Sequence, residues 1–353
     1  GTGRQAEQAG PQPEEEQEAT GRPPVDAVIL WVDGNDPVLN EKRKKYISRE
    51  GISEKHSGAI ATRFASSDEI SYCVRSIFKF APFVRNIFIV TDKQDPDLYE
   101  EVELYFPGRS SSIRVVDHEE IFRGYEKYLP TFNSSSILAM LWRIKGLAEN
   151  FVAFSDDLFL VREIKYSDWF KNGRPVLRGY WRLPPIRKMA GSSLKYFIKR
   201  RILGKEDYQP RISFYMRQWK SASCLGMRLR YYFHCHNPHP LNRITIENFF
   251  RDKPGLLEKT ASYRFRDKDQ LLLTSLAYHL EILSGNRNFA PLDLVYMHPY
   301  YSEKQLLKKL EECREKTEIK FLCVQSLEML GEKIQENVRS LLENILKKGR
   351  DDS

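Results

Sequence analysis

Two neighbouring aspartates, Asp156 and Asp157, follow the short apolar run 151–154. Adjacent carboxylates repel each other unless a cation or a metal-bound phosphate neutralises their charge. Hard divalent ions such as Mg²⁺ are commonly held by one or two carboxylates together with phosphate oxygens of a substrate. The pair therefore indicates a metal and phosphate site, whereas an ordinary turn or a helix cap is the structural alternative.

A second cluster lies between residues 234 and 239, where three histidines and a cysteine stand close together. The spacing lacks the second ligand pair of a structural zinc site, so zinc is the weaker interpretation. Imidazole titrates near neutral pH and can take a proton from an attacking hydroxyl group. We therefore interpret the cluster as the source of a general base or acid, with a structural role as the alternative; its members are His234, Cys235, His236 and His239.

Two weaker signals accompany these clusters. Gly34 lets the backbone come close to a ligand beside Asp33, and Trp31 could stack on a base, although a plain turn is the commoner explanation of such a segment. Arg264 and Arg266 precede a predicted helix, and a guanidinium group can bind phosphate through two parallel hydrogen bonds. A surface ion pair with a neighbouring aspartate is the alternative for the arginines.

Alternating strands and helices must position these side chains. Apolar, β-rich runs predict strands, and segments with a 3.6-residue apolar period predict helices between them, which indicates an α/β fold with a mainly parallel central sheet. Ligands bind beyond the carboxyl ends of the strands in such sheets, so Asp33, Asp92 and the aspartate pair are expected to converge. The predicted strands are 25–32, 86–91, 113–117 and 151–154, and the predicted helices between them are 38–49, 66–81 and 134–147.

Composition limits the class of protein. The chain has 353 residues, of which 41% are hydrophobic, so it can bury a core and is not disordered throughout. It shows no secretory signal and no apolar run of about 18 residues, and its five cysteines are scattered, so we expect a cytoplasmic protein. The net charge of +8 suggests an anionic partner, such as nucleotide phosphates, an anionic membrane surface or nucleic acid.

Changes in composition predict four parts. Residues 1–24 are typical of a disordered tail or a cloning remnant, and 25–173 form the α/β part with the aspartate pair. Residues 174–232 form a basic, aromatic-rich segment for contact with an acceptor or a membrane. Within it, 188–205 predicts a basic amphipathic helix that either packs on the body or touches anionic lipid or a polyanionic acceptor. Residues 233–353 form a helical part that carries the histidine and arginine segments, with helices expected at 269–284, 302–316 and 328–348.

Taken together, these segments resemble the Stealth family. Its members include bacterial capsular polysaccharide sugar-1-phosphate transferases and the catalytic subunit of the lysosomal-enzyme GlcNAc-1-phosphotransferase. The similarity covers about residues 25–165 and 230–290 and extends over several separate signatures. The matching residues are 25–36 in the first signature; Arg63, Phe64, Asp68, Glu69, Arg75, Ser76, 81–91, 129–132, Asp156 and Asp157 in the second; and 236–239, Arg243, Phe265 and Arg266 in the third.

The resemblance implies a GT-A-like nucleotide-sugar-binding fold with a mainly parallel central sheet. It also implies transfer of a sugar-1-phosphate from a nucleotide diphosphate sugar to a glycan or lipid-linked glycan, with Mg²⁺ or Mn²⁺ as cofactor. His236, Asp157 and Arg266 match catalytic or sensitive positions of the family, and Asp156 with Asp157 forms the expected metal site. The residues expected to bind substrate or nucleotide are Trp31, Asp33, Gly34, Arg63, Asp68, Glu69, Ser134 and His239.

Several positions differ from the family pattern. Ser67 stands where the family usually has arginine, Leu138 where it often has glutamate, and Ser155 where it has asparagine. The last signature, usually Cys-Leu-Asn-Asp, corresponds to residues 323–326 and lacks the carboxylate because it ends in Gln325 and Ser326. These positions bear on the metal site and on the choice of donor sugar.

Two other functions fit part of the sequence. A GT-A glycosyltransferase that releases the nucleoside diphosphate could also use the aspartate pair, but the segments around His236 and Arg266 favour phosphoryl transfer. A non-catalytic polyanion-binding protein fits the charge, yet the chain shows no helix-turn-helix, zinc-finger or RNP pattern, and we expect no nucleic-acid partner. We therefore predict a bacterial-type cytoplasmic enzyme of capsule or cell-surface polysaccharide synthesis that is held peripherally at the inner face of the membrane.

Overall fold

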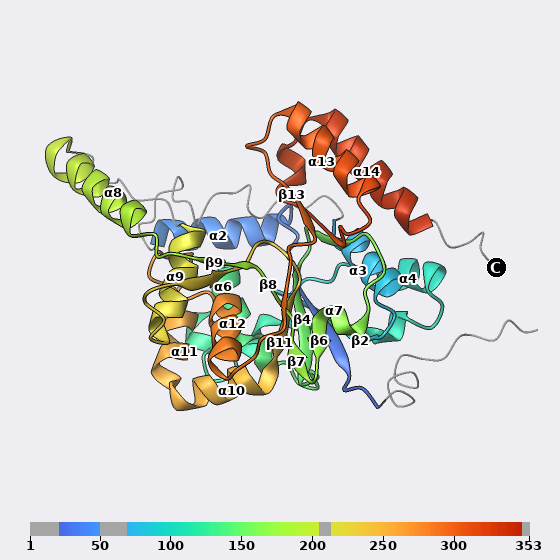
Figure 1. Cartoon of the computed structure of the whole chain (residues 1–353), viewed down its shortest axis with the longest axis horizontal. Coiled ribbons are helices and arrows are strands. Elements are labelled where there is room, and N and C mark those ends of the chain that lie inside the picture. Colours follow the sequence, from blue (N-terminus) through green and yellow to red (C-terminus); the bar gives the residue numbers. More distant parts are fainter. Residues whose placement is uncertain (1–20, 50–68, 205–212, 348–353) are drawn as a thin grey trace, which may run out of the picture.

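The computed structural model describes residues 21–49, 69–204 and 213–347, and a five-stranded sheet lies at its centre (Figure 1). Four neighbouring strands are parallel, and the fifth pairs antiparallel at one edge. The α/β class with a mainly parallel central sheet is thus confirmed, and all four predicted strands are present. In spatial order the strands are β11 (His239–Asn242), β4 (Asn150–Ser155), β1 (Val25–Leu30), β2 (Val84–Thr91) and β3 (Ile113–Asp117).

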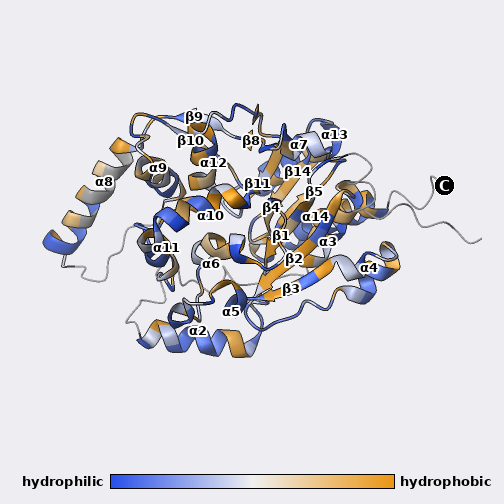
Figure 2. Ribbon diagram, turned by 90° about the horizontal axis from the view of Figure 1, so that it is seen from below, coloured by the Kyte–Doolittle hydropathy of each residue, from blue (hydrophilic) through white to orange (hydrophobic). Residues whose placement is uncertain are grey.

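Helices cover both faces of this sheet because its central strands are apolar on both sides. In β1, Ala27 and Ile29 contribute to one apolar cluster, whereas Val28 contributes to a second cluster. Figure 2 shows β1 and β2 coloured mostly as hydrophobic. The first cluster includes side chains of α3 (Glu69–Phe80), α13 (Glu303–Glu315) and α14 (Glu332–Lys347), and the second includes side chains of α6 (Ser134–Met140), α10 (Arg243–Asp252), α11 (Pro254–Ala261) and α12 (Leu273–Leu283).

A smaller sheet of three strands lies beside the central one. In it, β14 (Phe321–Val324) pairs antiparallel with β5 (Leu158–Leu160) and parallel with β13 (Leu294–Met297). The helices expected in the C-terminal part occur as α12, α13 and α14. The strands β13 and β14 of this part, however, are not predicted from the sequence. Apolar runs of four residues cannot be told from pieces of a helix by periodicity, and these strands depend on partners far away in the chain.

The other elements connect or extend these layers. The helix expected at 38–49 occurs as α2, whereas the helix expected at 134–147 ends earlier and continues as a short 3₁₀ turn at 141–143. No helix within the described ranges is long and apolar enough to cross a bilayer. The division of the chain into four parts stays a prediction. The remaining elements are α2 (Pro37–Arg49), α4 (Tyr99–Tyr105), α5 (His118–Ile121), α7 (Tyr166–Trp169), β6 (Phe170–Lys171), β7 (Arg174–Pro175), β8 (Leu177–Arg178), β9 (Tyr180–Arg182), α8 (Ile186–Phe197), α9 (Phe214–Cys224), β10 (Tyr231–Phe233) and β12 (Phe289–Ala290).

A buried carboxylate fastens the amino-terminal edge of the central sheet. Asp26 of β1 has no exposed surface, and its oxygens accept hydrogen bonds from Arg85 Nε (3.0 Å) and Nη2 (2.7 Å). The same carboxylate accepts from the backbone N–H groups of Asn86 (3.1 Å) and Ala148 (2.7 Å). Asp26 therefore joins β1 to β2 and to the chain that leads into β4, and these are the strands whose opposite ends carry the acidic residues.

Replacing Asp26 by alanine should lower the free energy of unfolding by about 3 kcal/mol, because it removes the buried partner of Arg85 and leaves the N–H groups of Asn86 and of buried Ala148 without this acceptor. Urea denaturation followed by circular dichroism measures this change. The matched control is Glu303→Ala, which removes a carboxylate from an exposed pair with Lys333 and should change stability little. Equal effects of the two substitutions would contradict the role given to Asp26.

Candidate active site

The aspartate pair lies where the chain leaves the central sheet for the smaller one. Asp156 and Asp157 form the two-residue turn between β4 and β5, and both are half-buried. The carbonyl of Asp157 accepts a hydrogen bond from Val324 N of β14 at 3.0 Å. Its carboxylate accepts a hydrogen bond from Ser155 Oγ. Two sheets therefore fix the backbone of the pair, and the carboxylates cannot move apart freely.

The environment of the turn disfavours negative charge. Burial, and then the charge of Asp157, raises the pKa of Asp156 to about 8. Burial also raises the pKa of Asp157, although Ser155 and Arg266 oppose that shift. Glu328, just after β14, has a pKa raised by burial and by Asp157, and its Oε1 atom is buried without a hydrogen-bond partner. The turn thus holds more negative charge than its neighbours neutralise.

Arg266 is the cation that faces this charge. Its Nη2 donates to Ser134 Oγ at 2.6 Å, and its charge lowers the pKa of both Asp157 and His236. Arg266 is therefore close enough to interact with Asp157 and His236, which match catalytic or sensitive family positions as it does, and with Ser134, which is expected to bind substrate or nucleotide. They come from four separate segments between residues 134 and 266, so the tertiary structure brings them together.

Packing between two distant segments sets the position of Arg266. The rings of Phe132 and Phe265 stack with centroids 5.3 Å apart, and Phe132 N donates to the carbonyl of Arg264 at 2.9 Å. Asn133 caps α6 by accepting from Ser135 N, and its Nδ2 donates to the carbonyl of Tyr263 at 2.9 Å. The segment before α12 is thereby locked to the start of α6, which places Arg266 beside Ser134.

Two aromatic rings clamp the imidazole of His236. Phe214 of α9 stacks on it with centroids 4.9 Å apart and an interplanar angle of 15°. Tyr296 of β13 stacks on it with the same centroid distance and an angle of 8°. Burial, followed by the charges of Arg266 and His298, lowers the pKa of His236 to about 4. His236 is thus held in one plane and is neutral at physiological pH, as a general base must be.

Phe214 and Tyr296 are site residues that the sequence analysis misses. Tyr296 lies between His236 and the aspartate turn: its hydroxyl donates to Gln325 Oε1, and the charge of Asp157 contributes to the rise of its pKa after burial and Cys323. In the sequence, Tyr296 is one aromatic residue in a short apolar run, 60 residues from His236. The only sequence signal for this side of the site comes from Gln325, the partner of Tyr296, because Gln325 belongs to the segment that resembles the last family signature.

The other histidines of the cluster do not form a metal site with His236. His234 is buried, and its Nε2 and Nδ1 atoms lie 3.0 Å from Thr274 Oγ1 and 3.1 Å from the carbonyl of Cys235. His239 Nδ1 lies 3.2 Å from the hydroxyl of Tyr278. In the parts of the chain that the structure describes, no three histidine, cysteine or acidic side chains are arranged to hold one ion. His239, expected to bind substrate, thus lies on β11 against Tyr278.

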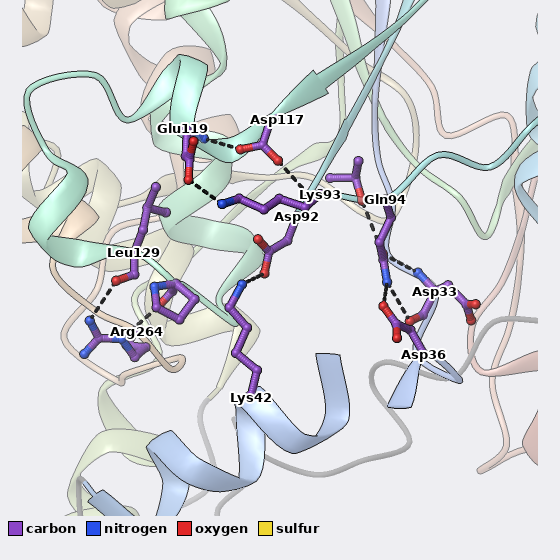
Figure 3. Close-up of polar contacts among 12 residues, drawn as sticks. Asp33, Asp36, Lys42, Asp92, Lys93, Gln94, Asp117, Glu119, Leu129 and Arg264 are labelled. Atoms are coloured by element: carbon purple, nitrogen blue, oxygen red, sulfur yellow. Dashed lines mark hydrogen bonds and ion pairs between the residues drawn. The ribbon is translucent and has the colours of Figure 1, made fainter. Parts of the chain in front are cut away.

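The ends of β1 and β2 carry a second polar region along the same edge of the sheet (Figure 3). Gln94 holds the loop after β1, because its Oε1 accepts from Asp33 N at 2.9 Å and its Nε2 donates to Asp36 Oδ2 at 2.8 Å. Lys42 Nζ lies 2.6 Å from Asp92 Oδ2. In the sheet, Leu30 at the end of β1 is paired with Ser155 of β4 on one side and with Val90 of β2 on the other, so this region adjoins the aspartate turn. The expected convergence of acidic residues at one edge is thus observed.

Other expected binding residues lie in different surroundings. Gly34 lies in the Gln94-held loop, and its carbonyl accepts from Asn40 Nδ2 at 2.7 Å. Glu69 begins α3 and is buried close to β14, since burial and then Asp157, Glu69 and Asp156 raise the pKa of the Cys323 thiol. Arg63 and Asp68 lie outside the described residues.

Trp31 corrects one expectation from the sequence. Its side chain belongs to the hydrophobic cluster beneath α3 and is only 7% exposed. Its backbone N–H donates to the carbonyl of Val90 at 3.0 Å, which continues the pairing of β1 with β2. A base needs an exposed ring face for stacking, and apolar neighbours cover this one. Trp31 is therefore a core residue here, and we do not retain it as a platform for a base.

The aspartate turn fits a divalent cation. An ion would relieve the repulsion between Asp156 and Asp157. Its positive charge would also attract the buried Oε1 atom of Glu328, which has no hydrogen-bond partner. Because no group of three suitable side chains is preformed among the described residues, Asp156 and Asp157 would hold the ion together with oxygens from phosphate and water. Mg²⁺ is commonly bound in this way, and it retains several waters.

Comparison with known proteins matches two segments of the chain to one family. Residues 23–51 match Stealth protein CR1, conserved region 1, and residues 63–176 match Stealth protein CR2, conserved region 2. An exopolysaccharide phosphotransferase of Streptomyces coelicolor is 33% identical over 269 residues, which cover 74% of this chain and 26% of the relative. A capsular polysaccharide phosphotransferase of Actinobacillus pleuropneumoniae is 37% identical over 147 residues, 42% of this chain and 38% of the relative. The chain thus spans well under half the length of these two relatives.

Likenesses to solved structures are weaker. The galactosyltransferase LgtC, in complex with donor and acceptor sugar analogs, has a TM-score of 0.42 and 11% identity over 91% of this chain and 95% of that chain. Mouse xyloside xylosyltransferase 1 has a TM-score of 0.36 and 10% identity over 85% of this chain and 96% of that chain. The fold assignment rests on the strand order and directions described above, and not on these likenesses.

Replacing Arg266 by glutamine should raise the pKa of His236, because it removes a positive charge that opposes protonation of the imidazole. An NMR titration of the histidine ring protons, without donor or acceptor, measures this change in the pKa of His236. The control is Arg251→Gln on the exposed surface of α10, which should leave the titration of His236 unchanged. The same titration in the parent and R266Q proteins would show that the two side chains are not coupled.

Proposed function

The chain belongs to the Stealth family through its conserved regions 1 and 2, and on this premise we propose that it transfers a sugar-1-phosphate from a nucleotide diphosphate sugar to a hydroxyl group of a glycan. The observation that carries the proposal is the placement of Arg266, which contacts Ser134 and acts electrostatically on both Asp157 and His236. One cation beside a carboxylate turn and a neutral imidazole suits a reaction at phosphorus, where negative charge lies on the transferred group.

The donor would lie along the carboxyl edge of the central sheet. Its pyrophosphate would lie beside the aspartate turn and Arg266, and its nucleoside would extend over the ends of β1 and β2, towards Asp33 and Asp92. A divalent ion held by Asp156 and Asp157 would supply Lewis-acid stabilisation of the phosphate oxygens. Arg266 and Ser134 would bind the same oxygens by hydrogen bonds and would hold the phosphorus in place for attack.

The acceptor hydroxyl would approach from the side of His236. A neutral ring nitrogen of His236 takes the proton of that hydroxyl, and the acceptor oxygen forms a bond to the β-phosphorus. The bond from this phosphorus to the bridging oxygen breaks, and the nucleoside monophosphate leaves with the electron pair. The products are a sugar-linked phosphodiester and a protonated His236, whose plane Phe214 and Tyr296 have fixed before the reaction.

Protonation of His236 needs a change of electrostatic environment, and the donor would provide it. In the free protein, burial and Arg266 hold the pKa of His236 near 4, which makes the imidazole a weak base. The pyrophosphate would neutralise the charge of Arg266 and bring negative charge close to the ring. Both effects favour the imidazolium form, so the base would gain strength when the donor is bound.

A glycosyltransferase that releases a nucleoside diphosphate is the second candidate, because the aspartate turn would serve either reaction. In that case the acceptor attacks the anomeric carbon and the β-phosphate stays on the nucleotide. The phosphoryl-transfer proposal draws support from the Streptomyces and Actinobacillus relatives, which are an exopolysaccharide phosphotransferase and a capsular polysaccharide phosphotransferase. The acceptor would then be a capsular or other cell-surface glycan, free or lipid-linked, and the reaction would take place at the inner face of the membrane.

Donors labelled with ³²P at the β-phosphate distinguish the two reactions. With Mg²⁺ and a membrane-glycan extract, phosphoryl transfer puts the label into the glycan and releases an unlabelled nucleoside monophosphate. We expect His236→Ala to reduce this transfer by about 100-fold or more with little loss of donor binding, as expected for loss of a general base. The control is Lys304→Ala on the exposed surface of α13, which should retain activity. Label that stays in a released nucleoside diphosphate would refute sugar-1-phosphate transfer.

Replacing Asp156 by asparagine should raise the Mg²⁺ concentration needed for half-maximal activity by about tenfold or more, since a charged ligand becomes a neutral one. Mn²⁺ binding, followed by electron paramagnetic resonance in the absence of donor, gives a second readout. Asp97→Asn is the matched control in an exposed loop, where asparagine tolerates the positive φ of 50°. An unchanged metal requirement in D156N would remove Asp156 from the metal site.

A further inference from the structure

Helix α8 and the π-helical turn that follows it, residues 198–202, extend away from the rest of the molecule (Figure 1). Globular proteins rarely leave a contiguous set of large apolar side chains in water. Among the side chains that the structure describes in this segment, such residues are exposed from Ile186 to Ile202, by 55% at Phe197 and by 66% at Ile202. The large apolar residues that remain exposed here are Leu183, Ile186, Leu194, Phe197, Ile198, Ile202 and Leu203.

The spacing of these residues places most of them on one stripe. Ile186, Leu194, Phe197 and Ile198 recur at intervals of three, four or eight residues, the spacing of one helix face. The polar remainder is strongly basic: residues 183–204 contain six lysines and arginines and no aspartate or glutamate. Four of these, Lys195, Lys199, Arg200 and Arg201, lie in the last part of the segment.

We propose that the segment 183–204 docks on an anionic lipid membrane. A helix that combines an exposed apolar stripe with a basic polar face lies in the plane of a membrane interface, its apolar side chains among the acyl chains and its cations among the headgroups. A soluble polyanion would satisfy the positive charge but would leave the apolar stripe in water. An uncharged apolar partner would make no use of the positive charge that the sequence concentrates in this segment. The membrane satisfies both features together, with charge complementarity to anionic lipid.

The docking segment is connected to the candidate active site by short, paired strands. Residues 183–185 link α8 to β9, whose Arg182 lies opposite Tyr231 of β10. His236 follows the end of β10 by three residues. Arg182 packs over the rings of Tyr180, Tyr215 and Phe233, and Phe233 contacts Phe214 of the His236 clamp. Docking of α8 would therefore bring the His236 side of the site towards the bilayer.

This position suggests the class of acceptor, a conclusion that rests on the proposed function. If the acceptor hydroxyl approaches from the side of His236, an acceptor anchored in the same membrane would be delivered to the site from the lipid surface. A glycan linked to a membrane lipid is such an acceptor. Membrane docking itself does not depend on catalysis, and it is measured without donor or acceptor.

Vesicle sedimentation with the full chain tests the docking. The probes are vesicles of phosphatidylcholine alone and of phosphatidylcholine with 30% phosphatidylglycerol, without nucleotide. We expect at least tenfold stronger partitioning to the anionic vesicles. The apolar variant Leu194→Ser/Phe197→Ser and the charge variant Lys195→Glu/Arg201→Glu should each reduce that partitioning by about tenfold or more. The reason is that burial of apolar side chains and attraction to anionic headgroups both contribute to interfacial binding.

Matched controls separate this segment from the general surface of the protein. Leu104→Ser removes another exposed leucine, 64% exposed on α4, and Lys304→Glu/Lys308→Glu reverses two exposed charges on α13. Both should partition like the parent. Thermal unfolding followed by circular dichroism checks that every variant is folded, and because the altered side chains are exposed, their melting temperatures should match that of the parent.

Three results would overturn the proposal. The first is equal partitioning of the parent and of the folded L194S/F197S variant to anionic vesicles. The second is binding to heparin without binding to vesicles, which would identify a soluble polyanion as the partner. The third is dimerisation that depends on Leu194 and Phe197 in the absence of lipid, which would identify a second copy as the cover of the helix. Loss of sugar-phosphate transfer with intact vesicle binding would count against the proposed function alone.

Discussion

The repulsion between Asp156 and Asp157 is the constraint around which the site is built. The two carboxylates follow each other in a turn whose ends belong to two different sheets, so the backbone cannot separate them. Burial adds to the cost of their charge. A folded protein keeps such a turn by protonating one carboxylate or by bringing cations close to it, and here Arg266 supplies one positive charge from a distant segment. The remaining charge imbalance is what makes the turn suitable for a divalent ion and a pyrophosphate.

Arg266 couples the two halves of the proposed chemistry. It stabilises the carboxylate of Asp157 and, by the same positive charge, adds to the effect of burial that keeps His236 neutral. A ligand that neutralises Arg266 therefore changes both groups at once, and a phosphate does so with matching geometry. The stacked rings of Phe214 and Tyr296 contribute orientation, since an imidazole held between two parallel faces can rotate only in its own plane.

Local patterns predicted much of the framework, and particular residues show where such patterns stop. The strands ending before Asp33, Asp92 and Asp156 follow from apolar runs bounded by turn residues, and they place the acidic side chains at one edge. The same reasoning is wrong for Trp31, because a tryptophan next to a polar loop looks exposed until the packing beneath α3 is known. It also misses β13 and β14, whose four-residue apolar runs acquire strand geometry by pairing beside β5.

The sequence by itself determined the class of fold, the carboxylate turn and the identity of the histidine and arginine segments, because apolar periodicity and chemically distinctive residue types are local properties of the chain. Only the tertiary structure decided that His236, and neither His234 nor His239, is clamped between two aromatic rings near Arg266. It also decided that α8 extends from the body with Ile186, Leu194 and Phe197 exposed. Both outcomes depend on which distant segments pack together, and burial, stacking and charge coupling arise only from that packing.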